Sequence, residues 1–427
     1  MTNTLSILTL WLGVLGGHGD RPGADSARVA ALLNALTRTD PVICDLIGDQ
    51  LGNFWWSNGG GGLGRFGDAP SVQGAKDSLS GEITDPRAVT LLISNLGADS
   101  PCVRRVAAKL LGQSDVAANR LTQLLSDPSP RVRESAAYAA GVAERPETMA
   151  ALQRLLAGSD EGPAAMAAWA LGQIENPESG PALQSALRSG SPRVKLAAVW
   201  ALGQLDDAGY AKDVMPFLKD QDPAMRAVAA EALGQMESPR SAAALVAVLN
   251  DRSDDVRLAA VNALSQIEEP STVGPLEGLL LNDPNPRVRR EAANALGSLE
   301  LARSLEPLAR ALGDKDIDVQ RQAANAIESL DEIHKAPAAL VRATASPDAD
   351  VRRAAIKALA HIADPATVQT LVERLSDPDK DVRRAVVEGL GEINSPAAVA
   401  GLTRALSDRD PEVRRAAAEA LGNSQDN

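Results

Sequence analysis

Aromatic residues are scarce in this chain of 427 residues. Three Phe, two Tyr and five Trp make up 2% of the sequence, although hydrophobic residues as a whole reach 44%. Strands favour aromatic and β-branched side chains, whereas Ala and Leu favour helices. We therefore expect an all-α core of Ala, Leu and Val. The length also exceeds the ~250–300 residues at which a single core stops growing, so several domains or a repeat array are expected.

Cysteine and histidine are nearly absent as well. Two cysteines, Cys44 and Cys102, and three histidines, His18, His334 and His361, are too few for a Cys/His metal site or a framework of several disulfides. A nucleophilic centre needs its Ser or Cys close to a His. The two cysteines fall in the N-terminal part and two of the histidines in the C-terminal part. The sequence thus predicts no catalytic, metal or cofactor site.

The chain also lacks an excess of positive charge and a long apolar run. A net charge of -13 argues against general nucleic-acid binding, and no run of about 18 apolar residues predicts a membrane span. The segment Leu5–Gly17 is apolar, but no Lys or Arg precedes it. Two interpretations stay open for residues 1–24: a signal peptide, which would make the protein exported or periplasmic, or a buried N-terminal helix of a cytoplasmic protein.

The strongest feature present is an internal repeat. The string at Arg193–Gln204 returns in related form at Ala224–Gln235 and at Asp255–Gln266, each step being 31 residues. A fixed period of this size predicts a repeat architecture. The same register gives eleven anchor positions: Val103, Val132, Pro163, Val194, Met225, Val256, Val288, Val319, Val351, Val382 and Val413.

Each unit is expected to contain two helices, A and then B. Helix A is an amphipathic stretch such as Ala366–Leu375. Helix B contains the anchor and usually closes with Leu-Gly, which fits a glycine near its C-terminal boundary. Proline often opens helix B, where its missing N–H costs nothing. A capping residue lies three positions before most anchors: Ser100, Ser129, Ser191, Asp222, Ser253, Asn285, Asp316, Asp348, Asp379 and Asp410.

These residues resemble a known family, the HEAT-like repeats first described in phycobilisome lyases. The family pattern D-x-x-V-R-x-x-A-A-x-A-L-G appears at Asp379–Gly391 and at Asp410–Gly422, and the resemblance covers Asp85–Gly422. It implies a right-handed α-α solenoid of paired helices. It says little about function, because one scaffold hosts many activities. The last unit is expected to leave Val413, Ala417 and Leu421 uncovered.

The N-terminal region breaks the period. Residues 25–52 are interpreted as a degenerate first repeat, 53–84 as an insert rich in Gly and Trp, and 85–427 as the solenoid. Gly59, Gly61 and Gly64 match G-x-G-x-x-G, but no strand precedes them, so dinucleotide binding is not supported. The aromatic residues of the insert either cover the solenoid end or contact a partner: Phe54, Trp55, Trp56 and Phe66.

A basic column follows the anchors. Its members are Arg104, Arg133, Lys195, Arg226, Arg257, Arg289, Arg352, Arg383 and Arg414. One interpretation is an anion-binding ladder. The other, which we favour, is a ladder of salt bridges between repeats, because carboxylates such as Asp377 and Asp379 recur beside the column.

The second and sixth positions after each anchor lie one turn apart on one face of helix B. We call this the helix B face. Aromatic residues occupy its sixth position in three consecutive units, at Tyr138, Trp169 and Trp200, with Leu196 and Leu258 at second positions nearby. The second position is Arg in the last five units, at Arg290, Arg321, Arg353, Arg384 and Arg415. These are called the aromatic row and the arginine row.

Both rows have two interpretations. The aromatic rings either anchor a partner or pack against neighbouring helices. The arginine row either selects an acidic segment of a partner or is a solvated face neutralised by residues such as Glu388 and Glu419. The function we predict is a non-catalytic scaffold that holds a protein or peptide along the helix B face. The alternative is an accessory, lyase-like role in attaching a cofactor or chromophore, which the family resemblance implies.

Overall fold

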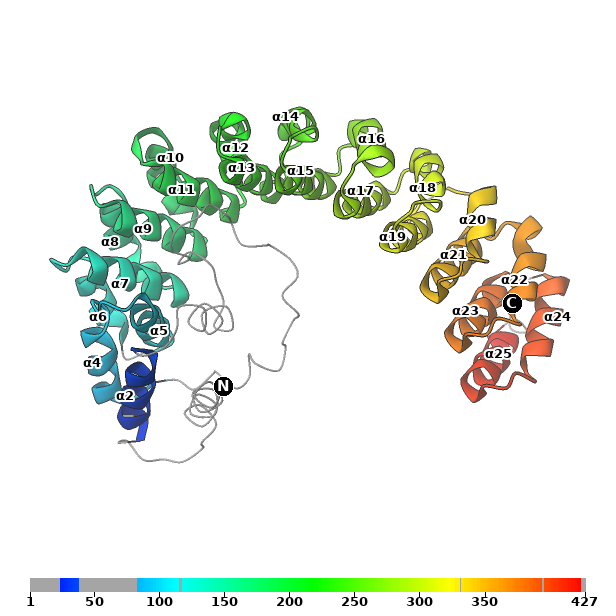
Figure 1. The fold of residues 1–427 in the computed structure, drawn as a ribbon, viewed down its shortest axis with the longest axis horizontal. Coiled ribbons are helices and arrows are strands. Elements are labelled where there is room, and N and C mark those ends of the chain that lie inside the picture. The colour runs from blue at the N-terminus through cyan, green and yellow to red at the C-terminus, as the bar shows by residue number, and fades with distance from the viewer. Residues whose placement is uncertain (1–23, 38–82, 115–116, 331, 394, 424–427) are drawn as a thin grey trace. The chain divides into compact units, whose positions relative to one another are not determined.

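A computed structural model describes residues 24–37, 83–114, 117–330, 332–393 and 395–423. Within these ranges every regular element is a helix, as expected. The interpretations of residues 1–23 and of the insert around Trp55 and Phe66 lie outside the described residues. The chain divides into two compact units, Met1–Met236 and Glu237–Asn427, and each is a row of helix pairs (Figure 1).

The first unit contains five A–B pairs, preceded by α2 (Ala24–Leu36), which packs beside α4. Its A helices are α4 (Pro86–Ser94), α6 (Ala118–Leu124), α8 (Met149–Leu156), α10 (Gly180–Ser189) and α12 (Ala211–Val214) with the 3-10 turn η5 (Met215–Lys219). Its B helices are α5 (Pro101–Gly112), α7 (Pro130–Val142), α9 (Glu161–Gln173), α11 (Pro192–Gln204) and α13 (Pro223–Gln235).

The second unit contains six pairs. Its A helices are α14 (Ala242–Val248), α16 (Val273–Asn282), α18 (Leu305–Ala311), α20 (Ala338–Ala343), α22 (Val368–Arg374) and α24 (Pro396–Ala405). Its B helices are α15 (Asp254–Ile267), α17 (Pro286–Ser298), α19 (Ile317–Glu328), α21 (Ala349–Ile362), α23 (Lys380–Glu392) and α25 (Pro411–Asn423). Short 3-10 turns precede several A helices in the two units: η2 (Pro146–Thr148), η3 (Pro177–Ser179), η4 (Ala208–Tyr210), η6 (Pro239–Ser241), η7 (Pro270–Thr272), η8 (Ala302–Ser304) and η9 (Pro365–Thr367).

The predicted caps open most of the B helices. The side chain of Ser191 accepts a hydrogen bond from the amide of Val194, and that of Asp379 accepts from Asp381 and Val382. These bonds satisfy first-turn amides that have no partner inside the helix. Two members of the column, Ser129 and Ser253, make no side-chain cap bond and hold the position through backbone conformation alone.

The Leu-Gly glycine lies near the end of helix B, as expected: α5 ends at Gly112, and Gly172 is the next-to-last residue of α9. The residue in the left-handed conformation after α9 is Glu175, with φ 51°. A Cβ on Gly172 would lie 2.8 Å from the Cα of Ala201 and 2.8 Å from Cζ3 of Trp200 on the next B helix. The glycine is therefore needed for close approach between helices. The left-handed position is filled by Glu, Asp or Ala: Glu144, Glu175, Asp206, Glu237, Glu268, Glu300, Glu332 and Ala363.

The core lies between helices A and B and between consecutive B helices. In α15 the anchor Val256 and the residues Ala260 and Leu264 are fully buried, four residues apart along one face. Two of the three residues that were expected to lie uncovered in the last repeat are buried, since Val413 and Ala417 are both 0% exposed. They are covered because α25 packs against α23 and α24 of its own unit. The third, Leu421, is half-buried. None of the described helices is both long and apolar enough to cross a membrane.

Candidate functional site

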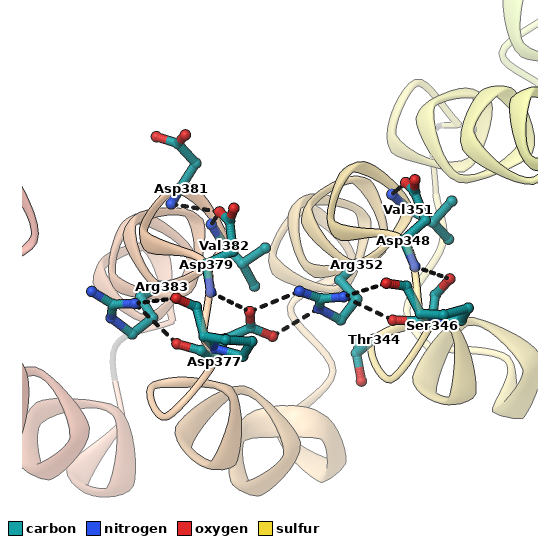
Figure 2. A network of polar contacts seen from close by, with 12 residues as sticks. Thr344, Ser346, Asp348, Val351, Arg352, Asp377, Asp379, Asp381, Val382 and Arg383 are labelled. Atoms are coloured by element: carbon teal, nitrogen blue, oxygen red, sulfur yellow. Dashed lines mark hydrogen bonds and ion pairs between the residues drawn. The ribbon is translucent and has the colours of Figure 1, made fainter.

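The basic column forms buried ion pairs between consecutive repeats, and Figure 2 shows two of its arginines. Nε and Nη2 of Arg352 lie 2.8 and 2.9 Å from the two carboxylate oxygens of Asp377 in the next repeat. Nη1 of Arg352 donates to the carbonyls of Ser346 and Pro347 in its own repeat, at 2.9 and 3.1 Å. Asp377 also accepts from the amide of Asp379. One arginine thus fixes two repeats to each other.

The same arrangement recurs along the second unit, and we call it the Arg–Asp ladder, each pair being a rung. Its rungs are Arg257–Asp283, Arg289–Asp314, Arg352–Asp377 and Arg383–Asp408. In the rung Arg383–Asp408 the side chains are only 3% and 9% exposed. The hydrogen bond between them raises the pKa of Arg383 and lowers that of Asp408. The favoured interpretation of the basic column as inter-repeat salt bridges is confirmed for these four members.

The first unit uses the column less regularly. Nη1 of Arg133 donates to the carbonyl of Asp127, at 2.6 Å, and Nη2 pairs with Asp160 at the start of α9. Arg226 donates to the carbonyl of Asp220 in the same way. At Ala164 the column has no charge, and α9 is the repeat that departs most from the pattern.

Two members of the aromatic row are buried. Tyr138 is 3% exposed and Trp169 6% exposed, and their rings stack with centroids 5.2 Å apart and an angle of 16° between planes. The ring of Trp169 also occupies the space above Gly141, where a Cβ would lie 2.5 Å from Cζ3. These contacts place both rings in packing between α7 and α9. Burial raises the pKa of the Tyr138 hydroxyl, because the charged phenolate form would lose its hydration.

The remaining apolar positions of the helix B face are half-buried. Trp200 and Leu196 lie one turn apart on α11, and Leu258 holds the equivalent second position on α15. Their neighbours at second positions are small and buried, since Ala165 is 3% and Ala227 6% exposed. Leu196 and Trp200 therefore provide the accessible apolar part of this face in the first unit.

The arginine row is accessible, and each member pairs with a nearby carboxylate. Arg353 pairs with Asp350 at 2.7 Å and Arg384 with Asp381 at 3.6 Å, both one turn earlier on the same helix. Arg290 contacts the adjacent Glu291 at 2.7 Å, and Arg415 contacts Glu419 at 2.8 Å. Exposed fractions of the arginine side chains rise from 34% at Arg321 to 81% at Arg415.

Sequence reasoning did not identify the acidic residues directly before the anchors. Asp318, Asp350 and Asp381 face the arginine row from the preceding turn. Their signal was the spacing of three residues between an Asp and an Arg, which brings two side chains together on a helix. The arginine row is thus half of a mixed-charge surface. Exposed polar residues fill the sixth positions from α15 to α25: Asn262, Asn294, Asn325, Lys357, Glu388 and Glu419.

Lys109 holds the sixth position on α5, at the start of the helix B face. Burial lowers its pKa to about 8, because a buried ammonium loses its hydration. Its neighbour one turn earlier, Arg105, is only 7% exposed. Across the described ranges there is no group of three His, Cys, Asp or Glu residues that could hold a metal ion.

Comparison with known proteins identifies the repeats. The profile of HEAT repeats matches eight overlapping segments that run from residue 89 to residue 422, more than half of the chain. No curated protein matches the sequence significantly.

Solved structures share the fold at low sequence identity. A structure of importin beta in an ammonium sulfate condition aligns with TM-score 0.55 and 15% identity, covering 99% of this chain and 64% of that one. A structure describing how Kap95p binding induces the switch loops of RanGDP to adopt the GTP-bound conformation aligns with TM-score 0.52 and 15% identity, covering 100% and 62%. An engineered protein aligns with TM-score 0.45 and 23% identity, covering 79% and 98%.

This chain therefore spans under two thirds of the importin beta chain and of the chain matched in the Kap95p–RanGDP structure. Those likenesses confirm the α-solenoid fold. The matched repeats, with the paired helices and the ladder between them, give the identity: the chain belongs to the HEAT-repeat family.

Proposed function

We propose that this protein is a non-catalytic scaffold that binds a protein or peptide along the helix B face of its second unit. One observation carries the proposal. From α17 to α25 the second and sixth positions of each B helix reach solvent, while the anchors of the same helices are fully buried. A row of accessible side chains on rigid, equally spaced helices is a surface that one extended partner can contact at several points.

The comparisons support a protein partner. A structural neighbour comes from a study of Kap95p binding to RanGDP, in which one protein acts on another. This chain folds as a solenoid of the same kind, which offers a partner protein a long surface. The described residues contain no group of side chains that could hold a metal ion. We also propose that the repeats are of the phycobilisome-lyase HEAT-like type, because Asp379–Gly391 and Asp410–Gly422 keep that pattern almost unchanged.

The arginine row is proposed to select an acidic part of the partner. Arg353, Arg384 and Arg415 are 41%, 45% and 81% exposed, so an incoming carboxylate can reach them. Each arginine would exchange an intramolecular carboxylate, such as Asp350, for one of the partner. Exposed ion pairs contribute only ~0–1 kcal/mol each, so this exchange costs little and sets specificity and association rate more than affinity.

The test reverses three charges of the row. The variant carries Arg353→Glu, Arg384→Glu and Arg415→Glu, and affinity capture with chemical cross-linking from the source lysate is compared with that of the wild type. We expect recovery of the partner to fall about tenfold or more, which corresponds to ~1.4 kcal/mol of binding free energy. Cross-links are expected on the helix B face of α17–α25.

A matched control places the same charge change elsewhere. Arg310→Glu, Arg342→Glu and Arg404→Glu reverse three exposed arginines on the A helices α18, α20 and α24. Circular dichroism first establishes that both variants keep the helical content of the wild type. Equal loss of the partner in the control, or equal recovery by all three proteins, would overturn the proposal, because binding would then not depend on this face.

A further inference from the structure

The Arg–Asp ladder is interrupted at one step of the second unit. The steps α15–α17, α17–α19, α21–α23 and α23–α25 each have a buried rung. At the step α19–α21 both partners are replaced, since Gln320 stands where Arg is expected and Ser346 where Asp is expected. The link that fixes the orientation of adjacent repeats is therefore missing between α19 and α21.

The local geometry is consistent with a lost link. Gln320 keeps only the bond within its own repeat, from Nε2 to the carbonyl of Asp314 at 2.5 Å. A rung carboxylate such as Asp377 also accepts from the amide two residues later. Ser346, at the equivalent position, keeps this bond, because its Oγ accepts from the amide of Asp348 at 3.3 Å. The local turn is therefore kept, but neither Gln320 nor Ser346 carries the charge that an ion pair between the repeats needs.

A different and more exposed contact joins the two repeats. Nη2 of Arg321 lies 3.3 Å from Oδ2 of Asp350 and 3.7 Å from Oδ1 of Asp348, both at the start of the next B helix. The side chains of Arg321 and Asp350 are 34% and 44% exposed, whereas both partners of the rung Arg383–Asp408 are below 10%. Exposed pairs of this kind are weak and are screened by salt.

The A layer offers little to replace the rung. Helix α20 has six residues, of which Leu340 and Ala343 are buried, whereas α16 has ten residues and buries four. A groove of about 550 Å³ lies along α18 and α20, and Gln320 and Arg342 are among its lining residues. The B helices remain in register, because Val319 and Val351 are both 0% exposed. At this step the B helices α19 and α21 pack closely on each other, whereas the short A helix α20 buries few residues.

We propose that the step between α19 and α21 is a joint, closed by the exposed contact of Arg321 with Asp350 and opened when that contact is screened or exchanged. Bending there changes the spacing between the parts of the arginine row on either side, Arg290 with Arg321 and Arg353 with Arg384. The joint does not depend on the proposed binding function, because it follows from the missing rung alone.

The gap at Ala164 in the first unit is not a joint of this kind. There the stacked rings of Tyr138 and Trp169 join α7 to α9, and Gly172 lets α11 approach α9 closely. Between α7 and α9 the pair of Arg133 with Asp160 adds to this packing, and between α9 and α11 packing takes the place of the rung. The steps on either side of α9 are therefore expected to stay rigid.

The test measures two distance distributions in the full chain by electron paramagnetic resonance. Spin labels are attached to p-acetylphenylalanine, which leaves the native cysteines unchanged. One pair, at Glu306 on α18 and Gln369 on α22, spans the missing rung and one intact rung. The matched pair, at Arg342 on α20 and Thr403 on α24, spans two intact rungs. All four positions are exposed.

The first pair is expected to give a distribution at least about twofold broader than the matched pair, because an exposed ion pair holds geometry weakly. It should broaden further from about 10 mM to about 1 M salt, as the Debye length falls from ~30 to ~3 Å. The double substitution Gln320→Arg with Ser346→Asp restores the rung and is expected to bring the first pair to the width of the matched pair at both salt concentrations.

A second variant keeps the proposal testable if the protein with the restored rung does not fold. Arg321→Gln removes the exposed contact and should give the broad, salt-independent distribution already at low salt. Equal widths for the two pairs at both salt concentrations would overturn the proposal. So would a broad distribution that persists after the rung is restored in a protein with unchanged circular dichroism.

Discussion

At the scale of single residues, two kinds of glycine occur inside helices and should respond oppositely to alanine. A Cβ on Gly172 would come within 2.8 Å of Ala201 and Trp200, whereas nothing lies within 4 Å of the equivalent position on Gly278 in α16. We expect Gly172→Ala to lower the free energy of unfolding by about 1–3 kcal/mol through overpacking. Gly278→Ala should raise it by about 0.5–1 kcal/mol through helix propensity. Urea unfolding followed by circular dichroism measures both, and a shift of the same sign in the two variants would contradict the distinction.

A second residue-scale prediction concerns the left-handed turn after helix B. Glu268 has φ 51° and ψ 33°, a conformation that costs a residue with a Cβ roughly 1–2 kcal/mol. Glu268→Gly is expected to stabilise the protein by about 0.5–1 kcal/mol, since part of the relief is offset by the greater freedom of glycine in the unfolded chain. The control Gln266→Gly places glycine two residues earlier, inside α15, and should destabilise by ~1 kcal/mol. Thermal unfolding midpoints of the two variants should move in opposite directions.

At the scale of helix pairs, the rung Arg383–Asp408 should make stability depend on acidity. Its hydrogen bond with Arg383 lowers the pKa of Asp408 below the ordinary value. Stabilisation from a carboxylate with a lowered folded pKa is complete above its unfolded pKa of about 3.9, and it is lost as pH falls through the lower folded value. Asp408→Asn is expected to cost about 2–3 kcal/mol at neutral pH, and the difference from the wild type should shrink below about pH 4.

Urea unfolding at neutral pH and near pH 3 measures this dependence. The matched control is Asp381→Asn, which removes an exposed carboxylate that lies 3.6 Å from Arg384. Its cost should stay below about 1 kcal/mol. A difference between Asp408→Asn and the wild type that is constant from neutral pH to pH 3 would show that the ion pair does not contribute through its charge.

The helix pairs also show what sequence could predict. Caps such as Asp379 and the anchors were recognisable because capping and periodicity are local properties of the chain. The role of Gly172 was not, because a glycine near a helix end fits both a boundary and a close contact, and only the distance to Ala201 distinguishes them. Burial of Tyr138 and Trp169 was left open for a similar reason: spacing assigns residues to a face, but the neighbouring helix decides whether that face is covered.

At the scale of the whole molecule, each helix packs on elements close to it in the repeat order. The loss of stability that a substitution causes should therefore stay within the neighbouring repeats. Helix α23, for example, contacts α21, α22, α24 and α25. In such arrays stability is approximately a sum of repeat and nearest-neighbour terms. Loss of the rung in Asp408→Asn should therefore lower amide hydrogen-exchange protection in α23–α25 and leave α5–α9 unchanged. Gly172→Ala should show the reverse pattern, with loss confined to α9 and its neighbours. Mass spectrometry of exchanged peptides resolves these segments, and a uniform loss of protection across both units would mean that the chain unfolds as one cooperative body, with stability set by long-range coupling that nearest-neighbour packing does not provide.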